Sequence, residues 1–177
     1  ARFVNVSSAA VYGTPVVLPV EERAATRPES PYGAGKLSSE FYARAAHRIH
    51  GLDIVTVRPF NAYSSRQRGD DAYAGVVMRF AERVRAGRPP VVYGDGAQTR
   101  DFVHAKDIAR WILALASRDA AAPAGSVVNL GTGEATSIAE LAQWFLAAGG
   151  LPGSPEYLPA RPGEIAHSVA DVTFARS

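Results

Sequence analysis

Asp53-Ile54-Val55-Thr56-Val57, with Pro59 two residues further on, is the stretch that decides the fold class. Its apolar and β-branched residues are typical of a strand buried on both faces, and the proline ends it. Residues 2–6 form a similar run, and a helix over 32–50 is expected between the two, after a long loop over 13–31. Strand, loop, helix and strand in this order predict an α/β protein with a parallel sheet.

The second half of the chain contains shorter elements. Apolar residues at helical spacing predict helices over 72–86 and 107–116, and Ser137 with Glu140 forms a capping box for a third helix ending near Ala148. Short extended segments are expected at 91–93, 101–104 and 127–130, with a loop-rich tail after Pro152. The change from α/β repeats to short strands and loops predicts a smaller lobe packed on the sheet domain.

Composition excludes several classes of protein. The 177 residues are 47% hydrophobic and 20% charged, with a formal net charge of +2, which is typical of a folded globular domain and excludes disorder. The absence of cysteine excludes a disulfide framework, a Cys-based zinc site and a thiol nucleophile. No apolar run approaches the roughly 18 residues that span a bilayer, and no secretion signal is visible, so we expect no membrane association and a cytoplasmic location.

The basic residues do not predict nucleic-acid binding. Their one dense stretch consists of Arg79, Arg83, Arg85 and Arg88, which we interpret as the solvated face of a helix. No metal site is predicted either, because the pair His47 and His50 has no acidic or third histidine ligand nearby.

A serine pair and a Tyr-Lys pair carry the clearest chemical signal. Ser7-Ser8 ends the first strand, and Tyr32-x-x-x-Lys36 begins the first helix. Tyr and Lys four residues apart share a helix face, so the ammonium favours the ionised phenol and makes the tyrosine usable as a base. The carboxyl end of a parallel strand is where open α/β sheets bind ligands. The alternative is an ordinary solvated helix face.

Five ordered segments extend this signal. They are Ser7-Ser8-Ala9-Ala10-Val11-Tyr12-Gly13, Ser30-Pro31-Tyr32-Gly33-Ala34-Gly35-Lys36, Arg58-Pro59-Phe60-Asn61, Gly94 to His104, and Arg161-Pro162-Gly163-Glu164. In order and spacing, these segments resemble the extended short-chain dehydrogenase/reductases that act on nucleotide sugars, which form the NAD-dependent epimerase/dehydratase family. The resemblance is greatest to the UDP-hexose 4-epimerases of that family.

The resemblance implies the C-terminal part of a doubly wound, Rossmann-type domain with a smaller α+β substrate lobe. Residues 1–63 would belong to the NAD-binding sheet domain and 64–177 mainly to the nucleotide-sugar lobe, with 101–131 partly returning to the sheet. The family's glycine-rich NAD loop is expected before Ala1. Gly131-Thr132-Gly133 does not replace it, because Thr136 stands where the third glycine should be.

The resemblance also assigns roles to individual residues. Tyr32 would be the catalytic base and acid, Lys36 would hold the nicotinamide ribose, and Ser8 would bridge the sugar hydroxyl and Tyr32. Ser7, Ser8, Tyr32, Lys36 and Phe60 would contact NAD. Substrate would be bound by Ser8, Tyr32, Asn61, Val76, Tyr93, Arg100, Arg161, Glu164 and Ser168. By composition alone, Phe60 is a core residue and Arg100 forms a surface ion pair with Asp95 or Asp101.

The implied reaction is NAD-dependent epimerisation at C4 of a UDP-hexose through a 4-keto sugar. Dehydratases of the family carry an acidic pair where this chain has Ala9 and Ala10, and the small Ser168 suggests room for N-acetylated sugars. The alternatives are another epimerase, a dehydratase or a decarboxylase of the family, or a non-catalytic nucleotide-sugar-binding fragment.

Relatives pair through the helix that carries the Tyr-Lys motif, so the resemblance also implies a homodimer. Leu37, Phe41 and Ile49 are the apolar residues of that helix expected to contribute, unless they face the sheet.

Overall fold

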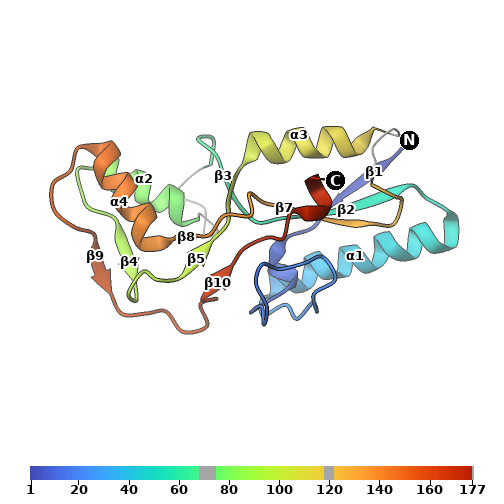
Figure 1. Ribbon diagram of the computed structural model, residues 1–177, viewed down its shortest axis with the longest axis horizontal. Coiled ribbons are helices and arrows are strands. Elements are labelled where there is room, and N and C mark those ends of the chain that lie inside the picture. The colour runs from blue at the N-terminus through green and yellow to red at the C-terminus, as the bar shows by residue number, and fades with distance from the viewer. Residues whose placement is uncertain (68–74, 118–121, 177) are drawn as a thin grey trace.

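A parallel three-stranded sheet forms the centre of the molecule. The computed structural model describes residues 1–67, 75–117 and 122–176. The strand order is β1 (Phe3–Val6), β2 (Ile54–Pro59) and β7 (Val127–Leu130), and both neighbouring pairs are parallel. Helices α1 (Pro31–His50) and α3 (Ala105–Ala116) cover opposite faces of this sheet (Figure 1). The predicted α/β fold is therefore confirmed.

The central strand is the most deeply buried of the three, as expected for a strand covered on both faces. Residues 54–58 of β2 are all buried, and Val55 and Val57 pack with Val128 of β7 and with Ile108 of α3. The short helix α5 (Thr173–Arg176) contacts β7 from the end of the chain.

Local signals define both ends of α1. Ser30 is its N-cap, with a side chain that accepts a hydrogen bond from the Gly33 amide at 3.0 Å, and Pro31 occupies the first turn, where a missing N–H costs nothing. Gly51 ends the helix with a φ of 64°, which favours glycine. The predicted helix over 32–50 is confirmed and begins one residue earlier.

A second lobe lies at the other end of the molecule (Figure 1). Helices α2 (Val76–Arg85) and α4 (Ile138–Gly149) pack together with the parallel pair β4 (Val91–Tyr93) and β9 (Glu156–Leu158). The predicted capping box of Ser137 and Glu140 is present at the start of α4. Of the helix expected over 72–86, residues 72–74 lie outside the described part. The core of this lobe consists of Phe80, Val92, Ile138, Leu141 and Ala142.

Short strands connect the two lobes. Strand β3 (Asn61–Tyr63) pairs with β6 (Phe102–His104), while β5 (Thr99–Arg100) lies between β8 (Thr136–Ser137) and β10 (His167–Ser168). The tail after Pro152 was expected to be loop-rich, and it also contains the short elements β9, β10 and α5. The strands β9 and β10 have three and two residues and form because they pair with strands distant in sequence.

No helix among the described residues is both long enough and apolar enough to cross a bilayer.

Candidate active site

The predicted serine and Tyr-Lys pair lie at the carboxyl edge of the sheet. Ser8 follows β1 and caps the single 3₁₀ turn η1 (Ala9–Val11), with its Oγ accepting a hydrogen bond from the Ala10 amide at 3.2 Å. Tyr32, in the first turn of α1, is 48% exposed. The Lys36 ammonium lies 5.8 Å from the centroid of the Tyr32 ring and donates a hydrogen bond to the carbonyl of Val6 at 2.9 Å. Tyr32 and Lys36 therefore share one helix face beside the end of β1.

A glycine allows the start of α1 to approach Ser8. Gly33 is buried, and a Cβ placed there would lie only 2.6 Å from the carbonyl oxygen of Ala10 in η1. No side chain longer than hydrogen fits in this space unless the backbone moves. The glycine at position 33 thus allows Tyr32 to lie next to the turn that Ser8 caps.

Ser7 and Phe60, which were expected to contact NAD, have buried side chains. The Ser7 hydroxyl donates a hydrogen bond to Glu40, and Glu40 forms an ion pair with Arg58. Phe60 is 5% exposed and packs against Tyr12 with ring centroids 6.3 Å apart. The sequence interpretation overlooked Glu40 and Arg58, although an acidic residue eight positions after Tyr32 and an arginine inside a buried strand were visible signals.

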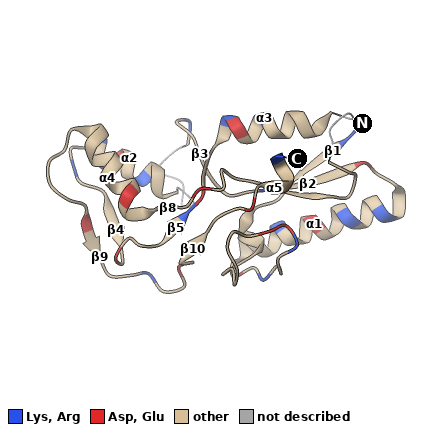
Figure 2. Ribbon diagram, in the orientation of Figure 1, with Lys and Arg blue, Asp and Glu red and all other residues tan. Residues whose placement is uncertain are grey.

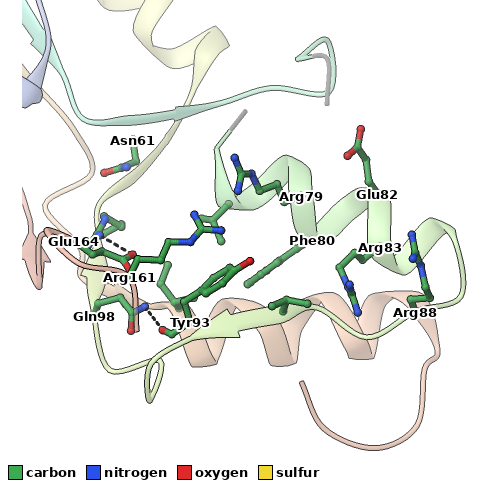
Figure 3. Close-up of a pocket in the computed structure, with 14 residues that line it drawn as sticks. Asn61, Arg79, Phe80, Glu82, Arg83, Arg88, Tyr93, Gln98, Arg161 and Glu164 are labelled. Carbon is green, nitrogen blue, oxygen red and sulfur yellow. Dashed lines mark hydrogen bonds and ion pairs between the residues drawn. The ribbon is translucent and has the colours of Figure 1, made fainter. Parts of the chain in front are cut away.

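Most of the predicted substrate residues line one cavity of about 470 Å³ at the junction of the two lobes (Figure 3). The cavity lies between α2, β4 and the segment that precedes β10. Ser168 is not part of its lining but pairs with Arg100 in the adjacent strands β10 and β5. The predicted residues that line the cavity are Asn61, Val76, Tyr93, Arg100, Arg161 and Glu164.

Two of the cavity's arginines contact other lining residues. Arg100 donates hydrogen bonds to the carbonyl of Thr99 at 2.8 Å and to the carboxylate of Glu164 at 3.4 Å. Burial lowers the pKa of Arg100, and the nearby Glu164 offsets part of this shift. The composition-based alternative, an ion pair of Arg100 with Asp95 or Asp101, is wrong because Glu164 is the acidic partner. The guanidinium of Arg161 lies over the Tyr93 ring (Figure 3).

The arginines of α2 and of the turn that follows it were expected to form a solvated helix face, but most of them line the cavity. Arg79, Arg83 and Arg88 line the same cavity, and Arg83 forms an ion pair of 2.6 Å with Glu156 in β9. Only Arg85 is exposed without lining the cavity. Among the described residues, the other Lys and Arg are spread over helices, strands and loops of both lobes and do not form one stripe (Figure 2).

Asp101, next to Arg100 in the sequence, is fully buried and joins the turn after β7 to the segment after β10. Its carboxylate accepts hydrogen bonds from the Thr132 amide at 2.8 Å, the Thr132 hydroxyl at 2.7 Å, the Gly133 amide at 2.9 Å and the Ala170 amide at 3.2 Å. Two amides of the Gly131-Thr132-Gly133 turn, those of Thr132 and Gly133, are therefore occupied by this side chain. They are not free to bind a phosphate group.

The sheet, the Tyr-Lys pair at its edge and the cationic cavity beside it define a Rossmann-type enzyme scaffold, and sequence comparison gives the family. Residues 1–131 match the model of the NAD dependent epimerase/dehydratase family. The chain belongs to this family.

Individual relatives include both epimerases and dehydratases. A UDP-glucose 4-epimerase of Mycolicibacterium smegmatis is 38% identical over 96% of this chain and 53% of that protein. A UDP-N-acetylglucosamine 4-epimerase from Methanobrevibacter ruminantium, solved with UDP-N-acetylmuramic acid, has a TM-score of 0.91 and 36% identity over 98% of this chain and 55% of that one. A dTDP-glucose 4,6-dehydratase from Streptomyces venezuelae, solved with NAD, has a TM-score of 0.85 and 30% identity over 99% of this chain and 52% of that one. The chain spans about half the length of the curated relatives that it matches.

The expected NAD cofactor is confirmed at the level of the family. The donor set in the structure fits one end of this cofactor. An ammonium and a half-exposed phenol at the carboxyl edge of a parallel sheet, Lys36 and Tyr32, suit the hydroxyls of the nicotinamide ribose. In the Gly131-Thr132-Gly133 turn after β7, the Thr132 and Gly133 amides already donate to Asp101, so they are not free to bind a pyrophosphate.

Proposed function

We propose that the natural polypeptide carrying this chain is an NAD-dependent 4-epimerase that interconverts UDP-glucose and UDP-galactose. The observation that carries the proposal is the single cavity lined by Asn61, Val76, Tyr93, Arg100, Arg161 and Glu164, because these residues come from separate segments and supply the donors that a nucleoside diphosphate needs. A site made from several elements is unlike a chance surface cluster.

The acid-base chemistry falls to Tyr32, Lys36 and Ser8. The phenol oxygen of Tyr32 takes the proton from the sugar's C4 hydroxyl and later returns it, which is general base and then general acid catalysis. Lys36 lies on the same helix face, with its ammonium 5.8 Å from the centroid of the Tyr32 ring. Ser8 orients the sugar hydroxyl toward Tyr32. NAD, when bound, supplies the oxidation and reduction at C4.

The cavity binds the nucleotide part of the substrate. Arg100 and Arg161 provide guanidinium groups for the diphosphate, and Asn61 provides an amide at the end toward the sheet. The Glu164 carboxylate accepts hydrogen bonds from the ribose hydroxyls. Tyr93, with the half-buried Val76 across from it, provides the stacking surface for a pyrimidine base.

Epimerisation is preferred over dehydration on one local observation. Eliminating water from C5 and C6 of the sugar requires an acid next to the catalytic serine, and Ala9 and Ala10 in η1 offer none. Because no acidic residue stands at these two positions, we favour an epimerase, although dehydratases are among the relatives. The second candidate, a nucleotide-sugar-binding protein without turnover, uses the same cavity.

We further propose that residues 1–63 serve the cofactor, that 64–177 serve mainly the substrate, and that 101–131 partly rejoin the sheet. The position of β7 beside β2 supports the last part. For a homodimer through α1, Phe41 and Ile49 are the apolar candidates because they are 55% and 72% exposed. Leu37 is excluded from this role because it packs on the core around Val11.

Product analysis tests the proposal. The natural polypeptide, supplied with NAD and UDP-glucose, is expected to form UDP-galactose, as followed by proton NMR of the anomeric signals. A 4-keto-6-deoxy sugar from dTDP-glucose would identify a dehydratase, and tight binding of UDP-glucose without product would identify the binding protein. We expect UDP-N-acetylglucosamine to be converted as well. Activity on UDP-glucose alone would contradict the role given to the small Ser168.

A further inference from the structure

A buried ion pair joins the helix that carries Tyr32 to the central strand. Glu40 and Arg58 have side chains only 2% and 3% exposed. The contact is bidentate, with Arg58 Nε donating to Glu40 Oε1 at 2.9 Å and Nη2 donating to Oε2 at 2.6 Å. Glu40 lies in α1 one turn beyond Lys36 and two turns beyond Tyr32, so the pair anchors this face of the helix to β2.

The same ion pair reaches both sides of Ser8. Glu40 also accepts the hydroxyl hydrogen of Ser7, the residue before Ser8. Arg58 donates through Nη1 to the Tyr12 hydroxyl at 2.9 Å, and Tyr12 directly follows the turn that Ser8 caps. The ion pair therefore holds Ser7, directly before Ser8, and Tyr12, directly after the turn that Ser8 caps. The same pair also holds α1, which contains Glu40.

The remaining polar groups of this cluster are also satisfied. Tyr12 donates its hydroxyl hydrogen to Asn129 at 2.7 Å, and Arg58 donates a further bond to the carbonyl of Glu22 at 2.9 Å. Burial lowers the pKa of Arg58, but the hydrogen bonds and charges of Glu40 and Tyr12 outweigh burial, so the net pKa is raised. Every side-chain nitrogen and oxygen of the pair thus has a hydrogen-bond partner in the folded protein.

Stability alone does not account for such a pair. Removing two charges from water costs about as much as their attraction returns, and apolar residues of similar volume often stabilise a protein equally well or better. What the bidentate geometry provides is a fixed distance and orientation between the elements it joins. The elements joined here are those that carry Ser8 on one side and Tyr32 with Lys36 on the other.

We propose that Glu40 and Arg58 are a positioning pair that fixes Tyr32 and Lys36 relative to Ser8. The inference rests on the proposed function, since it gives these three residues their role in the reaction. The pair touches neither the cavity nor the reacting groups, so it acts on turnover and not on nucleotide binding. General acid-base catalysis depends steeply on such placement.

The decisive variant replaces both charges by apolar groups, Glu40→Leu with Arg58→Met, in the natural polypeptide with NAD. We expect the double variant to fold because neither charge is left unpaired, with a lowered thermal midpoint because the Ser7 hydroxyl and the Glu22 carbonyl lose their partners. For UDP-glucose we expect kcat to fall by about tenfold or more while KM stays within about threefold. Unchanged kcat in the folded double variant would overturn the proposal.

A matched control uses a second ion pair at the same sheet. Arg2, just before β1, and Asp53, just before β2, form a contact of 2.9 Å at the amino end of the sheet, away from Ser8. The variant Arg2→Met with Asp53→Leu is expected to retain kcat. If both double variants lost kcat equally, the effect would come from general loosening of the sheet, and the proposal would be wrong.

Hydrogen exchange separates this inference from the proposed reaction. In the Glu40→Leu with Arg58→Met variant, amides of the first two turns of α1 and of residues 7–12 are expected to exchange at least tenfold faster than in the parent protein, while those of α4 are unchanged. This comparison holds even for a parent protein that does not convert UDP-glucose. Unaltered exchange in these segments would contradict the positioning role whatever reaction the enzyme performs.

Discussion

The guanidinium carbon of Arg161 lies 3.6 Å from the centroid of the Tyr93 ring, so an arginine covers the aromatic face that a nucleotide base would stack on. Cation–π contacts of this kind are worth about 0.5–2 kcal/mol, little enough for a ligand to displace. The contact therefore joins Tyr93, which we propose stacks on the base, to Arg161, which we propose binds the diphosphate. In the proposed site, a base stacked on Tyr93 would displace the guanidinium of Arg161, which would then be available to the diphosphate.

The first prediction follows from this exchange. Arg161→Ala removes a charge-assisted donor to phosphate, which contributes about 1.5–3 kcal/mol, so the affinity for UDP should fall by about tenfold or more. Arg85→Ala serves as the control, because Arg85 lies on α2 but does not line the cavity. Titration calorimetry with UDP measures both variants. Equal affinity of Arg161→Ala and the parent protein would exclude Arg161 from the nucleotide site.

The second prediction concerns two glycines in the first turns of α1. Gly33→Ala places a methyl group 2.6 Å from a backbone oxygen, whereas a Cβ at Gly35 meets no atom within 4 Å. We expect Gly35→Ala to stabilise the protein by about 0.5–1 kcal/mol, because alanine favours the helix, and Gly33→Ala to destabilise it. Urea unfolding of the two variants distinguishes these outcomes. A stabilising Gly33→Ala would mean that α1 does not approach η1 as closely as described.

The third prediction concerns Asp101. Asp101→Asn replaces one carboxylate oxygen with an amide nitrogen, which cannot accept the hydrogen bonds of Gly133 and Ala170 if the other oxygen serves Thr132. Leaving the buried Ala170 amide unpaired costs about 1–3 kcal/mol, and the part-buried Gly133 amide loses its partner as well, so the free energy of unfolding should fall by at least about 1–3 kcal/mol. For the exposed Asp107, whose partner is Arg110, the change Asp107→Asn should cost less than about 1 kcal/mol. Similar losses in the two variants would contradict the account of Asp101.

The fourth prediction is a pH dependence at the start of α4. The hydroxyl and then the amide of Ser137 hold the pKa of Glu140 below its usual value of 4.5. Stability from a carboxylate with a depressed pKa is present above the unfolded value and is lost as pH falls through the folded one. The urea midpoint should therefore drop more between pH 7 and pH 3 in the parent protein than in Glu140→Gln, which keeps the capping geometry without the charge. Equal drops would count against the carboxylate's contribution.

The features that sequence predicted well are local ones. The ends of α1 follow from Ser30, Pro31 and Gly51, and the shared face of Tyr32 and Lys36 follows from their spacing. These features depend on residues within one or two helical turns. The cavity residues were predicted from the order of the motifs, because no local rule brings residues of separate segments together.

The features that sequence missed depend on distant partners. Helical spacing correctly placed the arginines of α2 on a common helix, but whether Arg83 meets solvent or Glu156 is decided by β9, more than 70 residues later. The strands of the tail have too few residues for a periodic pattern and form only by pairing. Likewise, Glu40 reads as a surface residue until Arg58 is folded against it.

The most direct test of the central claim is the turnover of Tyr32→Phe in the natural polypeptide with NAD. The substitution removes one hydroxyl from a half-exposed side chain that does not line the nucleotide cavity. We predict that kcat for the conversion of UDP-glucose to UDP-galactose falls by about 10²–10⁴, as expected when a general base is lost, while the affinity for UDP is unchanged. A variant that converts UDP-glucose as fast as the parent protein would contradict the account.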